Sequence, residues 1–446
     1  MPQNQAHDTA SRREFLKSST LAAVGAGLLT QTAPLAGAYA GGDDLIRVGL
    51  IGCGGRGTGA AAQALSTAGE VKLVAMGDAF GDRIKSSLAA IQNEGGPKVA
   101  ARIDVPAERQ FVGFDAFQKV IDSGVDLVIL ATPPGFRPLQ FEAAVKAGKH
   151  VFMEKPVAVD APGVRQVLAA AAEAKKKNLG VGVGLQRHHQ AAYIETIKKL
   201  QDGAIGDMHT MRAYWNDRGV WVIDRQPGMS EMTYQMRNWY YFNWLCGDHI
   251  CEQHIHNLDV INWLKNGYPV RASGMGGRQV RTDKKFGEIF DQHAVEFEYA
   301  DGSRLFSQCR HIEGCWSSVS EHAQGTKGSS DISAGLIRMN GQPDWRYQPA
   351  KGSRPANPYQ VEHDDLFASI RAGKPINEAE YGALSSMTSI LGRMATYSGK
   401  VVEWKDALAS EISLQPKNYN FDENPPSMPN GDGHYAIAIP GSTRVV

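Results

Sequence analysis

Hydrophobic and polar positions follow a regular alternation over the first part of the chain. Short apolar runs predict buried strands, and the longer amphipathic or alanine-rich runs between them predict helices. The predicted strands lie at residues 45–51, 71–78, 125–134, 149–156 and 179–186, and clear helical patterns lie at 136–147 and 163–177. Strand–helix alternation of this kind predicts an α/β fold with a parallel, doubly wound sheet.

The pattern changes after residue 187. Residues 207–215, 271–280, 293–310 and 329–339 read as further strands, some with alternating polarity, whereas 317–331 and 340–358 are polar and rich in small residues and are expected to be loops. We therefore predict three parts: a leader at residues 1–40, a first domain at 41–187 and a second domain at 188–446.

Length and charge limit the kinds of partner. A chain of 446 residues usually divides into two domains, and 47 basic residues balance 47 acidic ones. A neutral chain lacks the basic field that holds nucleic acid or an anionic membrane, so we expect a small, uncharged partner and no nucleic acid. The five cysteines include no closely spaced pair of the kind that binds zinc. Whether Cys309 and Cys315 form a disulfide stays open.

The N-terminus carries a targeting pattern. Ser11 to Lys17 reads SRREFLK and resembles a twin-arginine export signal, and Ala38 to Ala40 fits a small-residue cleavage site. The apolar run between them is short and interrupted, which argues against a lasting membrane span. We expect cleavage near Ala40 and a periplasmic location. The twin-arginine route carries folded proteins, so a cofactor loaded before export is expected.

The first predicted strand leads into glycines with the GxGxxG spacing, namely Gly52, Gly54 and Gly57. This spacing provides a tight turn, a close approach to a pyrophosphate and close helix–strand packing. Asp78 ends the next strand, where an acid accepts hydrogen bonds from ribose hydroxyls and repels a 2′-phosphate. NAD is therefore favoured over NADP, although Arg83 lies nearby and Asp78 could instead cap a helix.

Four segments end strands and should meet at one crevice, because ligands of such sheets bind beyond the carboxyl ends of the strands. These segments are residues 52–57, Asp78, 132–134 and 154–156. A lysine at such a strand end, here Lys155, can hydrogen-bond a reacting hydroxyl beside a nicotinamide. The alternative is a surface lysine paired with Glu154.

Residues 247–259, GDHICEQHIHNLD, concentrate histidines and acids. On a continuous helix, Asp248, His249, Glu252, His256 and Asp259 would share one side. Three interpretations remain open: a metal site formed by His249, Glu252 and His256, a catalytic histidine with an acidic partner, or polar packing.

The stretch MEKPVAVD at residues 153–160, in a chain that opens with GxGxxG, closely resembles the Gfo/Idh/MocA oxidoreductase family, from about residue 45 to about 408. The resemblance implies a second α/β domain with a large, open, mainly antiparallel sheet, and an active site between the domains. His256 and Asp259 match the family motif, and Glu252 stands where the family usually has aspartate. On this basis His256 is expected to be the catalytic base, oriented by Glu252 and assisted by Lys155, with no metal ion.

Two larger sets of residues complete the expected site. The residues expected to bind the cofactor are Gly52, Cys53, Gly54, Gly55, Arg56, Gly57, Asp78, Thr132, Pro133, Glu154 and Lys155. The residues expected to contact substrate are Arg187, His188, Asn216, Asp217, Trp239 and Asn243. The aromatic residues 239–244 could stack on sugar rings, although core packing or a subunit contact is the commoner use of such clusters.

The interpretation that these features favour is an NAD-dependent oxidoreductase acting on a sugar, glycoside or cyclitol, and a homo-oligomer. The alternative enzyme oxidises a glycoside transiently and then eliminates the aglycone. A sugar-binding protein without catalysis is the third possibility, and Lys155 and His256 argue against it.

Overall fold

The computed structural model describes residues 44–350, 352 and 354–446. The export signal and its cleavage site lie outside the described residues. Among the helices of the described part, none has the length and apolar character needed to cross a membrane.

The first sheet is parallel and contains six strands in the order β3-β2-β1-β4-β5-β6. Its strands are β1 Ile46–Ile51, β2 Val71–Asp78, β3 Gln110–Val112, β4 Leu127–Leu130, β5 His150–Met153 and β6 Val181–Val183. The helices between them are α1 Gly55–Ser66, α2 Gly81–Glu94, α3 Gly96–Ala100, α4 Ala116–Asp122, α5 Arg137–Lys146 and α6 Ala161–Lys176. This confirms the predicted doubly wound sheet. The strand order reverses between β1 and β4, the position where such sheets open a ligand crevice.

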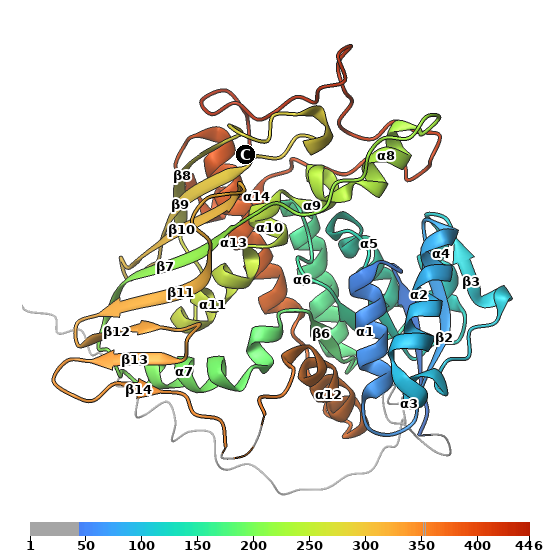
Figure 1. Ribbon diagram of the computed structural model, residues 1–446, viewed down its shortest axis with the longest axis horizontal. Helices are drawn as coiled ribbons and strands as arrows, with labels where there is room; N and C mark the ends of the chain where they lie inside the picture. The colour runs from blue at the N-terminus through green and yellow to red at the C-terminus, as the bar shows by residue number, and fades with distance from the viewer. Residues whose placement is uncertain (1–43, 351, 353) are drawn as a thin grey trace, which may run out of the picture. The chain divides into compact units, whose positions relative to one another are not determined.

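The second sheet contains nine strands in the order β14-β13-β12-β11-β7-β10-β9-β8-β15, and Figure 1 shows β8 to β14 side by side across it. The strands are β7 Met208–Asp217, β8 Arg271–Gly277, β9 Gln292–Glu298, β10 Arg304–His311, β11 Ser318–Gly325, β12 Gly328–Asp331, β13 Leu336–Met339, β14 Trp345–Arg346 and β15 Val402–Glu403. Only β7 and β10 pair in parallel, so the sheet is mainly antiparallel, as expected.

Two segments predicted as loops contain strands: residues 317–331 and, with the short strand β14, residues 340–358. Residues 318–325, predicted as part of a loop, form strand β11, which pairs antiparallel with β12. The buried positions of β11 include Glu321 as well as Ala323. A charged residue at an inward position removes the apolar alternation by which such a strand is recognised.

The remaining helices come from the second half of the chain. They are α7 Ala191–Gln201, α8 Glu231–Arg237, α9 Asn243–Cys246, α10 His249–Glu252, α11 Ile255–Lys265, α12 Pro358–Arg371, α13 Ala379–Ser398 and α14 Trp404–Ala409. Short 3₁₀ turns occupy Ala107–Arg109, Pro134–Phe136, Gln186–His189, Trp239–Tyr241 and Lys284–Phe286. The helix α13 packs against α6 and also against β8 and β9.

The helix α12 packs with the first sheet although it lies far along the chain. Leu366, Phe367 and Ile370 of α12 share one buried cluster with residues of β1, β2 and β4. Arg371 at its end donates hydrogen bonds to the backbone oxygens of Asp44 and Glu70. The hydrophobic core around the first sheet is therefore completed by residues 358–371.

Candidate active site

The glycine turn between β1 and α1 has the geometry that its spacing predicts. Gly52 has φ of +95°, a conformation that favours glycine. A Cβ atom on Gly57 would lie 1.9 Å from the carbonyl oxygen of Gly52, so only glycine allows α1 to pack this closely. A Cβ on Gly54 would meet nothing within 4 Å, and no side chain caps α1 there. The helix N-terminus thus faces open space, where backbone N–H groups can bind a pyrophosphate.

A cleft of about 490 Å³ begins at this turn. The wall formed by the first domain contains Gly52, Gly54, Gly55, Arg56, Asp78, Phe80, Arg83, Thr132 and Pro133. The opposite wall contains Trp221, Ile223, Met236, Arg237 and Trp239. Of the residues expected to bind a cofactor, Cys53 and Gly57 line neither this cleft nor the pocket that adjoins it, and Glu154 and Lys155 line the adjoining pocket. The size and the donors of the cleft fit a dinucleotide.

Asp78 lies at the end of β2 and lines this cleft. Its carboxylate accepts hydrogen bonds from the backbone N–H groups of Cys53 (2.7 Å) and Phe80 (2.9 Å). Burial raises the pKa of Asp78, and these two hydrogen bonds oppose the rise. The residue at the N-terminus of α2 is Phe80, so Asp78 does not cap that helix.

A second pocket of about 240 Å³ adjoins the cleft. The two share Arg56, Ala131, Thr132 and Trp239. The second pocket is also lined by Pro134, Arg137, Glu154, Lys155, Gly184, Gln186, Arg187, Trp215, Glu252, Gln253, His256 and Tyr359. The expected catalytic residues Lys155, Glu252 and His256 therefore meet in one pocket, next to the place for a dinucleotide.

Glu252 contacts Lys155 rather than His256. The Lys155 ammonium lies 3.0 Å from the Glu252 carboxylate and also donates to the backbone oxygen of Glu252. Burial raises the pKa of Glu252, and Lys155 acts in the opposite direction. The expected Glu252–His256 contact depended on a continuous helix, whereas α10 ends at Glu252 and α11 begins at Ile255. No hydrogen bond joins the two side chains within the described residues.

His256 is buried, and its surroundings favour the neutral form of the imidazole. Burial lowers its pKa well below the ordinary histidine value, and the positive charges of Lys155, Arg187 and Arg56 lower it further. Its Nδ1 atom has no hydrogen-bond partner among the described residues, and its ring stacks on Trp215 at 5.9 Å between centroids. A neutral imidazole of this kind can accept a proton from a bound substrate.

Two arginines, the buried Arg137 and the half-buried Arg56, hold the loops around the pocket. Arg137 donates to the backbone oxygens of Glu154 (2.9 Å) and Thr132 (2.7 Å), and burial lowers its pKa to about 10. Arg56 forms ion pairs with Glu154 and with Glu362 of α12. Arg137 was not anticipated from the sequence, although it directly follows the turn that ends a predicted strand.

Two of the six residues expected to contact substrate line the pocket, namely Arg187 and Trp239. Arg187 is buried and forms an ion pair with Glu321 of β11. Trp215 and Gln253 also line the pocket and were not anticipated. Trp215 belongs to β7. Because polar residues occur on both faces of this strand, its sequence does not indicate which face lines the pocket.

The other four expected residues do not line either cavity. His188 is stacked between Trp263 and Tyr381 and lies 2.8 Å from Asp259, so it is a packed histidine. The side chains of Asn216, Asp217 and Asn243 contact Gln308, the Arg218 backbone and Tyr397. Most of the aromatic residues 239–244 are core, as their spacing more often indicates.

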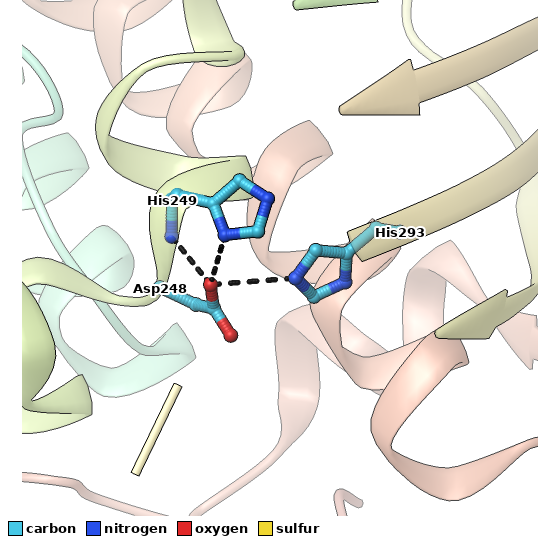
Figure 2. Close-up of side chains that lie close together, drawn as sticks. All are labelled: Asp248, His249 and His293. Carbon is cyan, nitrogen blue, oxygen red and sulfur yellow. Dashed lines mark hydrogen bonds and ion pairs between the residues drawn. The ribbon is translucent and has the colours of Figure 1, made fainter. Parts of the chain in front are cut away.

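The start of the histidine-rich segment forms a separate buried cluster. Figure 2 shows His249 and His293 facing one carboxylate oxygen of Asp248, at 2.8 and 3.3 Å. The other oxygen accepts from Tyr397 (2.5 Å) and from the Phe290 backbone (3.0 Å). Burial alone would raise the pKa of Asp248, but the histidines hold it well below its usual range.

This cluster differs from the metal set considered from the sequence. His249 joins Asp248 and His293, whereas Glu252 and His256 line the pocket. The donors around Asp248 come from α10, β9 and α13 and fix the start of α10 between them. The cluster thereby positions the helix whose last residue, Glu252, holds Lys155.

Comparison with known proteins finds similarity in the first domain. Residues 46–184 match the Gfo/Idh/MocA model, an oxidoreductase family with an NAD-binding Rossmann fold. Inositol 2-dehydrogenase of Rhizobium meliloti (strain 1021) is 27% identical over 250 residues, 56% of this chain and 63% of that protein. A glycosyl hydrolase family 109 protein of Solibacter usitatus (strain Ellin6076) is 32% identical over 155 residues, 34% of each chain. This chain thus spans less than two thirds of either relative.

A solved structure extends the similarity of fold to the second sheet. Aldose-aldose oxidoreductase from Caulobacter crescentus, complexed with glycerol, has a TM-score of 0.62 at 22% identity. The match covers 80% of this chain and 99% of that one, and identity this low shows the fold alone. Residues 46–184 therefore resemble the NAD-binding Rossmann domain of the Gfo/Idh/MocA oxidoreductase family.

Proposed function

We propose that the protein transfers hydride between a hydroxyl-bearing carbon of a sugar, glycoside or cyclitol and a tightly bound NAD. The observation that carries the proposal is the position of Lys155 and His256 in a pocket that adjoins the dinucleotide cleft. Two tryptophans, Trp215 and Trp239, line the same pocket and can pack against the apolar face of a sugar ring. An inositol dehydrogenase among the relatives supports a polyol or cyclic substrate.

Each protein group has a separate task in this reaction. The neutral His256 accepts the proton of the substrate hydroxyl, and Lys155 donates a hydrogen bond to the same oxygen. Glu252 holds the Lys155 ammonium by a carboxylate and a backbone contact. NAD, when bound, supplies the hydride acceptor.

We propose NAD rather than NADP as the cofactor. The Asp78 carboxylate lines the cleft. Each of its two oxygens accepts one hydrogen bond from a backbone N–H and keeps a second lone pair for a ligand. Those lone pairs can bind the adenosine ribose hydroxyls, and the negative charge disfavours a 2′-phosphate. Arg83 lines the same cleft and is the residue that could favour the phosphate instead.

We further propose that the enzyme is exported in the folded state with its cofactor and works in the periplasm after cleavage near Ala40. The support is the twin-arginine pattern at Arg12 and Arg13. Changing both arginines to lysine should retain the full-length protein in the cytoplasm, as measured by cell fractionation and immunoblotting. Unchanged periplasmic yield would contradict this localisation.

A homo-oligomer is also proposed. Met275 of β8 is 80% exposed and Phe306 of β10 is 44% exposed, on one face of the second sheet. Exposed apolar side chains on a sheet often mark a contact surface. Light scattering after size-exclusion chromatography tests the proposal, and a monomer at micromolar concentration would contradict it.

The central experiment begins with native mass spectrometry of purified protein, which should detect bound NAD(H). A panel of sugars, glycosides and cyclitols is then added, and reduction of the bound cofactor is followed by absorbance. Lys155→Met should lose the response while keeping the cofactor. Protein that carries no NAD(H) and binds it only at millimolar concentration would contradict the proposal.

A second candidate is a glycoside-cleaving enzyme that oxidises its substrate only transiently. The glycosyl hydrolase relative favours including it, and the same Lys155 and His256 could serve. Release of the aglycone with no net change in the bound cofactor would select this reaction. Accumulation of reduced cofactor with an intact glycosidic bond would select the dehydrogenase.

A further inference from the structure

The second wall of the dinucleotide cleft is formed by the segment between β7 and α9. Trp221, Ile223, Met236, Arg237 and Trp239 all line the cleft. Asn238 ties the two ends of this wall together, because its side-chain oxygen accepts from the Ile223 N–H at 2.9 Å. A dinucleotide bound on the glycine turn would therefore lie between the first domain and this segment.

A bidentate ion pair joins the two walls. The Arg237 guanidinium donates to both oxygens of Asp82, at 2.7 and 2.8 Å. It also lies over the ring of Phe80, with its carbon 3.9 Å from the ring centroid. Phe80 lines the cleft, and Phe421 of the C-terminal tail packs on it at 5.5 Å. Paired N–H donors and a ring contact fix the guanidinium in both orientation and distance.

The place of this bridge indicates what it does. Asp82 stands in the first turn of α2, four residues after Asp78, which is the proposed ribose acceptor. The bridge therefore crosses the cleft at the adenosine end. We infer that the Asp82–Arg237 bridge slows release of the dinucleotide, so that the cofactor stays bound from one turnover to the next. This inference rests on the proposed NAD-dependent function and names the residues that retain the cofactor.

The exposure of the pair gives the inference a measurable signature. The Asp82 side chain is 61% exposed and that of Arg237 is 22% exposed. An ion pair this accessible is screened by salt, so the release rate should rise with ionic strength. Breaking one exposed bidentate pair together with its ring contact should accelerate release by about tenfold.

The chain offers a matched control in the same segment. Arg225 also pairs with a carboxylate, Glu231 at 2.5 Å, and also lies over a ring, Tyr234 at 4.0 Å. These contacts join residues on one side of the cleft and do not bridge to the first domain. Arg225→Ala therefore removes similar interactions while leaving the two walls joined.

The test measures release of NADH from the loaded, full-length protein by nicotinamide fluorescence after a chase with excess NAD⁺. Arg237→Ala should release NADH about tenfold faster than the wild type, and Asp82→Asn, which keeps the ring contact, should accelerate release by a smaller factor. Both variants should show a weaker dependence on salt. Arg225→Ala should behave like the wild type.

Two results would overturn the inference, and a third would contradict the proposed function. Equal release from the wild type and Arg237→Ala would overturn the inference and leave the proposed function standing. Equal acceleration by Arg225→Ala would show general loosening of the segment and would also overturn it. Failure of every protein to bind NADH would instead contradict the proposed function.

Discussion

Replacement of His256 by alanine tests the proposed base most directly. His256 is 6% exposed, and its Nδ1 atom is free of hydrogen bonds among the described residues. Alanine removes the one histidine that lines the pocket among the described residues. A correctly placed base contributes about 10²–10⁴-fold, equivalent to roughly 3–5 kcal/mol in the barrier.

The pH dependence of kcat/KM provides a second, independent test of His256 as the base. Burial and the nearby cations hold the pKa of His256 well below the usual histidine range. The base therefore stays unprotonated as pH falls through about 6.5, where an ordinary histidine would already be half protonated. In the oxidation direction, kcat/KM of the wild type should stay level through that range and decline only in more acidic buffer.

The assay is the rate of cofactor reduction with the best substrate of the panel, measured across pH for the wild type, His256→Ala and His209→Ala. His209 is exposed on β7 and serves as a control for the loss of an imidazole. NAD affinity should be unchanged in His256→Ala, because His256 does not line the dinucleotide cleft. Turnover within tenfold of the wild type, or an unchanged acid limb in the variant, would refute the assignment of His256 as the base.

Three further predictions concern the cofactor turn and acid stability. Gly57→Ala should destabilise the fold, because its Cβ would lie 1.9 Å from a backbone oxygen, whereas Gly54→Ala should weaken NAD binding and leave the thermal midpoint nearly unchanged. Asp78→Ala should weaken NAD binding by about 1.5–3 kcal/mol per lost hydrogen bond and improve binding of NADP relative to NAD in calorimetry; equal affinities of variant and wild type would contradict this. His150 accepts a hydrogen bond from Gly180, and burial lowers its pKa to about 4, so the unfolded chain binds the proton first. The free energy of unfolding should therefore fall by about 3 kcal/mol between pH 6.5 and 4, and urea unfolding of His150→Gln should lack this contribution.

Local sequence signals predicted the dinucleotide domain well. The spacing of Gly52, Gly54 and Gly57 specifies a turn that depends on only a few neighbouring residues. The buried strands on either side also read directly from short apolar runs. These features could be predicted because their physical causes lie within a few positions of one another.

The catalytic pocket was predicted only in part, because its contacts join distant segments. Lys155 and Glu252 are 97 positions apart. The residues around Glu252 in the sequence do not indicate that its carboxylate pairs with Lys155 and not with His256. The break between α10 and α11 contains neither proline nor glycine, the residues that usually mark a helix end in a sequence. His188 was predicted to face substrate from its place after the last strand, yet two aromatic rings enclose it.

The late helix α12 has a consequence for how the polypeptide acquires its structure. Leu366, Phe367 and Ile370 share one buried cluster with apolar side chains of the first sheet, including Ile46 and Val48. During synthesis, a nascent chain ending near residue 187 would leave that apolar surface in water, where it is prone to aggregation. The first domain can complete its hydrophobic core only after residues 358–371 have been made. Folding of the two halves should therefore be a single cooperative event, completed late and before any export.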